Sequence, residues 1–208
     1  MNNPEIKQIS ETPGEYEYAT SRVIQIGYEK QEGFQYYLKS SVETEVVGNT
    51  IVSTCGTETI PKSCTESNVT TIEANTWYET SSTTPSVVYR QNGTLYALTG
   101  DGTNVSGTST YTVTKIDTEN PNVEVSVSGK TATFTFSDNV GILSYGVNQS
   151  NTEEPSYAST TSTSATWTAS SAGTYYVWVK DKAGNTSNTP FTIDASAVSY
   201  THLRAHET

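Results

Sequence analysis

The chain has 208 residues, of which 33% are hydrophobic, and its formal net charge is −11. An acidic surface repels phosphate backbones, and no cluster of Lys or Arg offsets this repulsion, so the charge argues against nucleic-acid binding. The sequence also lacks a run of about 18 apolar residues, so it predicts no membrane-spanning helix in this fragment. Thr, Val, Ile and aromatic residues, including 14 Tyr, recur in short runs between polar turns, as is typical of β-rich chains.

A first module is predicted over residues 5–117. Its early apolar runs, Arg22–Lys30 and Gly33–Ser41, predict two strands connected as a hairpin. A longer polar middle segment follows them and contains the only two cysteines of the chain, Cys55 and Cys64.

The short, polar loop between Cys55 and Cys64 contains Pro61 and predicts a disulfide, which indicates an oxidising compartment. Closing such a loop would contribute about 2–3 kcal/mol to stability. Two free thiols are an alternative. A metal pair is a further alternative, but zinc takes four ligands, and residues 1–197 contain no histidine or further cysteine.

Three blocks of sequence recur in the same order, which predicts a duplicated module. Gly93–Asp101 aligns without gaps with Gly173–Asp181, sharing Gly, Thr, Tyr and Asp at the same places. Gly33–Leu38 resembles Gly141–Gly146. Each copy of the first block is followed by a turn and by an alternating strand that ends in Ile-Asp.

The second module is predicted over residues 118–197. Alternating apolar residues and frequent turns predict at least six short strands and an antiparallel sandwich. The strands are expected at residues 123–127, 130–137, 141–147, around 165–167, 173–180 and 189–193. Between the last two strands, Asp181–Asn185 predicts a hairpin turn in which Gly184 or Asn185 takes a positive φ.

The strand Gly173–Lys180 can be oriented in two ways. In one, Tyr175, Val177 and Val179 face the core. The opposite orientation follows from the first copy, where Tyr96 and Leu98 look more core-like than their neighbours. The sequence leaves both open.

Residues 121–193, with the segments SDNVGI and YYVWVKDKAGNTSN, resemble bacterial immunoglobulin-like (Big-type) repeats of Gram-positive cell-surface proteins. Residues 96–117, YALTGDGTNVSGTSTYTVTKID, resemble the end of a similar repeat. The resemblance implies an all-β chain of two tandem antiparallel immunoglobulin-like β-sandwiches. It also implies that Tyr175 takes a place like that of the tyrosine corner. Such repeats act as stalks, spacers or adhesive modules, although a fold alone does not define a function.

The C-terminal run 198–208, VSYTHLRAHET, differs abruptly in composition from the rest of the chain and contains both histidines. It resembles a translated sequencing adapter, read through at the end of a metagenomic fragment. We therefore expect this run to be unstructured. We also disregard His202 and His206 as a metal pair, although their spacing would suit one on a helix.

The sequence predicts no catalytic residues and no enzyme. A Ser-His-Asp or Cys-His site needs a base, and residues 1–197 contain no histidine. The adjacent carboxylates Glu153 and Glu154 would point to opposite sides of a strand, which does not suit a glycosidase pair. No cofactor is expected, except that Asp117 and Glu119, at the junction of the modules, are weak calcium candidates. Solvated, turn-capping Asp is the simpler interpretation.

We therefore expect a non-catalytic stalk, spacer or adhesin repeat outside a bacterial cell. Its expected partners are neighbouring immunoglobulin-like repeats and host or cell-wall glycans or proteins. No signal peptide or anchor is visible, which we interpret as truncation. The alternative is a carbohydrate-binding accessory module of a secreted hydrolase. Its sugar-stacking surface aromatics would include Trp77, Tyr176 and Trp178.

Overall fold

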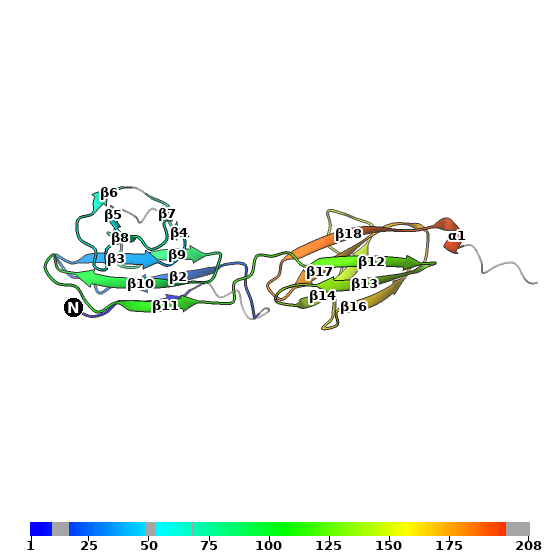
Figure 1. The fold of residues 1–208 in the computed structure, drawn as a ribbon, viewed down its shortest axis with the longest axis horizontal. Coiled ribbons are helices and arrows are strands. Elements are labelled where there is room, and N and C mark those ends of the chain that lie inside the picture. The colour runs from blue at the N-terminus through cyan, green and yellow to red at the C-terminus, as the bar shows by residue number, and fades with distance from the viewer. Residues whose placement is uncertain (10–16, 49–52, 68, 199–208) are drawn as a thin grey trace, which may run out of the picture. The chain divides into compact units, whose positions relative to one another are not determined.

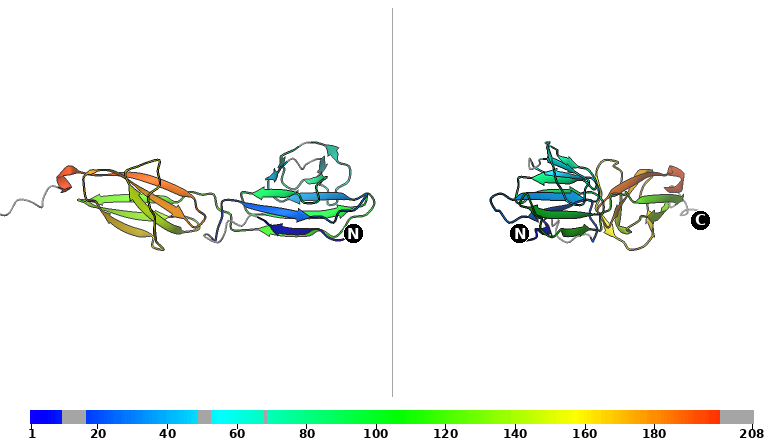
Figure 2. Two further views of the ribbon diagram at one scale, coloured as in Figure 1. Left: turned by 180° about the vertical axis from the view of Figure 1, so that it is seen from behind. Right: turned by 60° about the vertical axis from the view of Figure 1, so that its left-hand side comes forward.

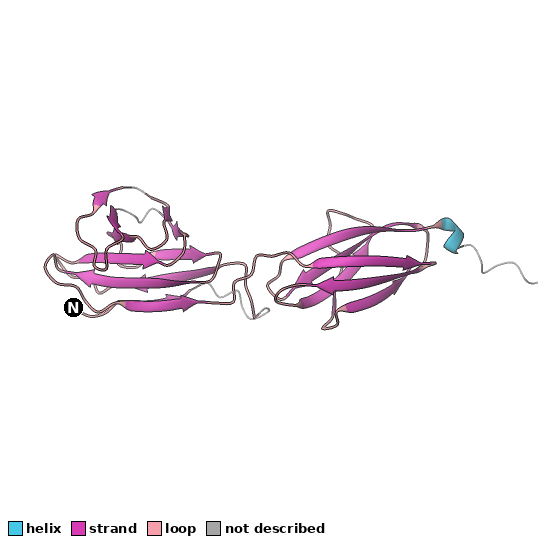
Figure 3. Cartoon of the chain, viewed as in Figure 1, coloured by secondary structure: helices cyan, strands magenta, loops and turns pink. Residues whose placement is uncertain are grey.

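The computed structural model describes residues 1–9, 17–48, 53–67 and 69–198 (Figure 1). The chain divides into two compact units, unit 1 (Met1–Thr118) and unit 2 (Glu119–Thr208), one residue beyond the predicted boundary. Within the described ranges the regular elements are strands, together with one short helix, α1 (Ala195–Val198) (Figure 3). The predicted all-β fold class is confirmed. Apart from Val198, which ends α1, the predicted adapter segment lies outside the described residues.

Unit 1 consists of two antiparallel sheets that stack in two layers (Figures 1 and 2). The five-stranded sheet has the order β1 (Glu5–Gln8), β2 (Arg22–Gly27), β9 (Ser86–Tyr89), β4 (Thr44–Val47) and β7 (Thr71–Ile72). The six-stranded sheet has the order β11 (Ser109–Val113), β10 (Gly93–Gly100), β3 (Gln35–Ser40), β8 (Trp77–Thr80), β5 (Ser53–Gly56) and β6 (Thr65–Glu66).

The core of unit 1 lies between these sheets. Ile24, Ile26 and Val87 of the five-stranded sheet pack with Leu38 and Leu95 of the six-stranded sheet, and all five are buried. Because side chains alternate across a strand, each sheet turns one apolar face inward.

The predicted hairpin between Arg22–Lys30 and Gly33–Ser41 is wrong. β2 pairs with β1 and β9, whereas β3 pairs with β10 and β8 in the other sheet. The two strands instead meet face to face through their buried side chains. An alternating pattern marks an inward face, but it does not say whether the next strand pairs edge to edge or crosses to the opposite sheet.

Unit 2 also contains two antiparallel sheets. The three-stranded sheet has the order β12 (Asn122–Ser128), β13 (Thr131–Ser137) and β16 (Ser164–Thr168). The four-stranded sheet has the order β15 (Ala158–Ser159), β14 (Ile142–Asn148), β17 (Gly173–Asp181) and β18 (Thr186–Ile193). Phe134, which is fully buried, contacts the rings of Phe136, Tyr145 and Phe191 in the core between them.

The two units share one strand order. The run β1-β2-β9 of unit 1 corresponds to β12-β13-β16 of unit 2, and β11-β10-β3-β8 corresponds to β18-β17-β14-β15. Two antiparallel sheets connected in this way form an immunoglobulin-like sandwich. The aligned segments Gly93–Asp101 and Gly173–Asp181 contain β10 and β17, which lie at equivalent places in the two units. The additional strands of unit 1, β4 to β7, all lie in the longer middle segment.

The orientation of the long strand in each unit is now defined. Tyr175, Val177 and Val179 lie in the core of unit 2, as the first of the two interpretations predicted. The opposite orientation is wrong, since Leu95 and Ala97 occupy the core of unit 1. The Tyr175 hydroxyl donates to the carbonyl of Ser171 at 2.9 Å, which is the backbone contact of a tyrosine corner.

Candidate functional site

The first and last strands of each unit run parallel to one another. In unit 1 the Ser109 hydroxyl, at the start of β11, donates to the carbonyl of Pro4, just before β1. Further along the chain, Ala19, which lies between β1 and β2, forms a parallel bridge with Ile116, which follows β11. In unit 2 the Ser187 hydroxyl donates to the carbonyl of Pro121, and the Thr189 hydroxyl donates to that of Val123 at 3.4 Å. These contacts advance in the same direction along β12 and β18 in unit 2, and along the first and last segments of the chain in unit 1. The chain therefore enters each unit at one end and leaves at the other.

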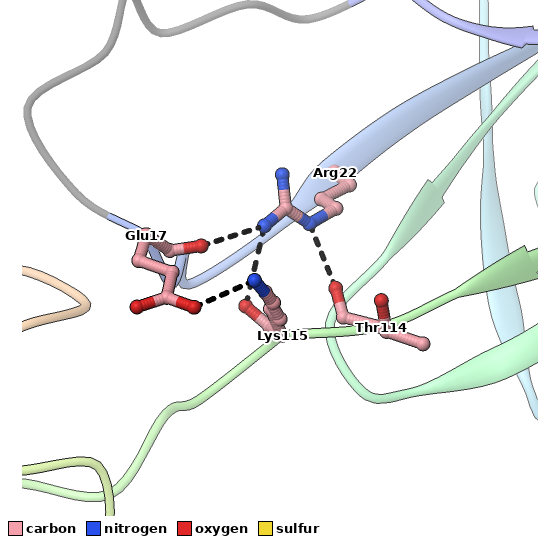
Figure 4. A network of polar contacts seen from close by, with 4 residues as sticks. All are labelled: Glu17, Arg22, Thr114 and Lys115. Carbon is pink, nitrogen blue, oxygen red and sulfur yellow. Dashed lines mark hydrogen bonds and ion pairs between the residues drawn. The ribbon is translucent and has the colours of Figure 1, made fainter.

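Polar contacts fix Thr114 and Lys115, close to the point where the chain leaves unit 1 (Figure 4). Arg22 donates from Nε to the carbonyl of Thr114 at 2.9 Å and from Nη2 to the carbonyls of Glu17 and Lys115, each at 3.4 Å. The Lys115 ammonium lies 2.6 Å from a carboxylate oxygen of Glu17. The Ala19 N–H donates to the Lys115 carbonyl at 2.9 Å, which adds a main-chain contact.

The inserted segment of unit 1 carries a disulfide between Cys55 and Cys64. This confirms the predicted pairing and excludes both free thiols and a metal pair. Cys55 packs with Trp77 and Leu98 in a small cluster separate from the main core. The Lys39 ammonium lies 4.7 Å from the centre of the Trp77 ring, a cation–π contact that shields the ring further.

Two of the predicted surface aromatics are buried. Trp77 is 1% exposed because it lies within the disulfide cluster. Trp178 is 7% exposed, and its indole N–H donates to Asn148 Oδ1 at 3.2 Å and to the Ser150 carbonyl at 3.1 Å. The prediction that these rings lie on the surface is therefore wrong, and neither can stack on a sugar. Tyr176 is half-buried.

Two carboxylates of unit 2, from turns far apart in the sequence, lie close together. An oxygen of Asp138 and an oxygen of Asp181 are within 4.8 Å of each other. Asp138 Oδ1 accepts the N–H groups of Val140 and Gly141, both at 2.8 Å. Asp181 Oδ1 accepts those of Ala183 at 2.7 Å and Asn185 at 2.9 Å, and Oδ2 accepts the Asn185 amide at 2.8 Å.

Burial raises the pKa of Asp181, and the neighbouring Asp138 carboxylate raises it further, although hydrogen bonds from Asn185 and Ala183 lower it. The sequence predicted Asp181 only as the first residue of a hairpin turn. A turn motif carries no signal for the distant residue that it contacts, so sequence patterns could not pair Asp181 with Asp138.

The two calcium candidates at the module boundary have different surroundings. Asp117 is buried, and its backbone N–H donates to the Ala19 carbonyl at 3.0 Å within unit 1. Glu119 is exposed at the start of unit 2. Calcium binding by Asp117 and Glu119 stays a prediction.

Comparison with known proteins defines no family for this chain. No family model and no curated protein matches the sequence. Among solved structures, the chain is similar to a two fibronectin type-III domain segment from chicken tenascin, with 16% identity and a TM-score of 0.34. That match covers 92% of this chain and 97% of the other. The described part of the chain contains no helix long and apolar enough to cross a membrane. The strand order therefore defines the class, a tandem of immunoglobulin-like modules.

Proposed function

We propose that this chain is a non-catalytic, extracellular segment of a bacterial surface protein of the Big type, acting as a stalk, spacer or adhesin repeat. Neighbouring repeats of the same kind are its expected partners, and host or cell-wall glycans or proteins are its expected ligands. The Cys55–Cys64 disulfide supports an oxidising compartment outside the cytoplasm.

The parallel arrangement of the first and last strands carries the proposal. Because the chain enters and leaves a unit at opposite ends, a pull along the chain shears these strands past one another. Contacts such as Ser187 to Pro121 and Thr189 to Val123 are then loaded together. This geometry suits a module that holds its neighbours apart under tension.

Single-molecule pulling of unit 2 within the full chain tests the proposal. Handles at the two chain ends load β12 and β18 in shear. Handles on the exposed residues Ser128 and Asp194, introduced as Ser128→Cys and Asp194→Cys, pull from the end where β12 and β18 both finish. The second geometry peels the strands apart one contact at a time.

We expect unit 2 to unfold at a clearly higher force when pulled from the chain ends than from the paired handles. Equal forces in the two geometries would remove the mechanical basis of the proposal. Unfolding of the double-cysteine variant from the chain ends is the matched control, because it carries the same substitutions without the altered pulling direction.

The alternative is a carbohydrate-binding accessory module. Two of the three aromatic rings proposed to stack on sugars, those of Trp77 and Trp178, are buried and cannot contact a ligand. We therefore propose the stalk role in preference to it.

A further inference from the structure

The Asp138–Asp181 pair of unit 2 carries negative charge that the surrounding protein does not neutralise. Asp181 is 0% exposed, and its carboxylate lies beside that of Asp138. Neither carboxylate forms an ion pair with a Lys or Arg side chain within the described part of the chain. Two like charges sharing a shielded site are unfavourable unless a cation or a proton lies between them.

One oxygen of the pair also lacks a partner. Asp138 Oδ2 is buried and accepts no hydrogen bond from the described residues. A buried polar atom that makes no hydrogen bond is destabilising, so the unpaired carboxylate oxygen points to a ligand. The other oxygen of Asp138 is already engaged by its own turn.

Unit 1 offers an internal comparison, because Asp101 occupies the place in the repeat that Asp181 occupies in unit 2. Asp101 Oδ1 also accepts two backbone N–H groups, from Thr103 at 2.9 Å and Asn104 at 2.7 Å. Asp101 is exposed, and these hydrogen bonds lower the pKa of its carboxyl. Asp181 makes the same kind of turn contacts, yet its pKa is raised by burial and by Asp138. The turn alone therefore does not explain the site in unit 2.

We propose that Asp138 and Asp181 together bind one divalent cation of the calcium type, with Asp138 Oδ2 as a direct ligand. Hard cations take carboxylate and carbonyl oxygens, and calcium accepts irregular oxygen sets completed by water. The proposal rests on Asp138 and Asp181 of unit 2, and it does not depend on the stalk role.

Calorimetric titration of the chelator-treated full chain with calcium chloride tests the site. We expect one binding event with a Kd on the order of 10⁻⁴ to 10⁻³ M, the range of weak calcium sites. Asp138→Asn removes a charge but keeps an Oδ1 acceptor for Val140 and Gly141, and it should weaken binding about tenfold or more. Asp101→Asn is the control, because it removes the same charge from an exposed turn carboxylate of unit 1, the counterpart of Asp181, and it should leave binding unchanged.

Thermal unfolding of unit 2 in the unmodified chain provides a second readout that needs no variant to fold. At a hundredfold excess over Kd, calcium should raise the unfolding midpoint of unit 2 by roughly 10–20 °C relative to chelator. No calcium heat, no change of midpoint, or undiminished binding by Asp138→Asn would overturn the proposal. A unit 2 whose stability responds to pH but not to calcium would show that the two carboxylates share a proton, which also overturns it.

Discussion

Removing the Cys55–Cys64 disulfide should destabilise unit 1 and leave unit 2 unchanged. The two cysteines are nine positions apart, so the bond closes a loop of about ten residues. The loss of conformational entropy in the unfolded chain then corresponds to about 2.7 kcal/mol at 25 °C. A double Cys55→Ala, Cys64→Ala variant should lose about this amount, together with a smaller contribution from the packing of Cys55 against Trp77.

Amide hydrogen exchange with mass spectrometry measures this loss separately in each unit. The free energy of global opening for peptides from β3, β10 and β8 should fall by about 2.7 kcal/mol or slightly more. Peptides from β13 and β17 act as an internal control and should not change. Unchanged exchange in unit 1 would refute the loop-closure argument. An equal fall in both units would refute their independent stability.

Three further substitutions test other parts of the fold. Phe134→Ala should destabilise unit 2 by about 3–5 kcal/mol, because it empties the centre of the aromatic cluster; peptides from unit 1 should keep their exchange rates, and a global loss would contradict separate cores. Tyr175→Phe should cost unit 2 about 1 kcal/mol in denaturant unfolding, since it removes the hydroxyl that donates to Ser171; no loss would show that this contact adds nothing to stability. The pKa of Asp181 is raised in the folded protein, so protonation of this carboxyl stabilises unit 2. The stabilisation is complete at a pH below 3.8, the ordinary pKa of the group, and is lost as the pH rises through the pKa of the folded state. In chelator, the stability of the unmodified chain relative to Asp181→Asn should therefore fall with rising pH in urea unfolding, and a rise would contradict the assigned direction.

Local patterns predicted the strands and their inward faces well. Alternation predicted a strand at residues 130–137, and its alternate residues Ala132, Phe134 and Phe136 are all buried in the core of unit 2. The repeated Gly-Thr-x-Tyr segment identified β10 and β17 as equivalent strands. The turn after β17 was also predicted, and Gly184 supplies its positive φ of 94°.

Long-range relations could not be read in the same way. Trp77 and Trp178 look like surface aromatics in sequence. Nothing near Trp77 indicates that it packs against Cys55, and nothing near Trp178 indicates that its N–H donates to Asn148 and Ser150. The same limit applies to the Asp138–Asp181 pair and to the contacts of Ser109 and Ser187 with prolines at the starts of their units. Each depends on strand order, which period-two patterning leaves undetermined.

Pulling the full chain from both ends, before and after reduction, tests the central claim that the chain is two separately folded sandwiches with a disulfide-closed loop in the first. We expect two distinct unfolding steps. Reduction should lengthen one of them by about 30 Å, the extended length of the nine positions that the disulfide spans, and leave the other unchanged. A single step, a gradual extension, or two steps that both ignore reduction would contradict this architecture.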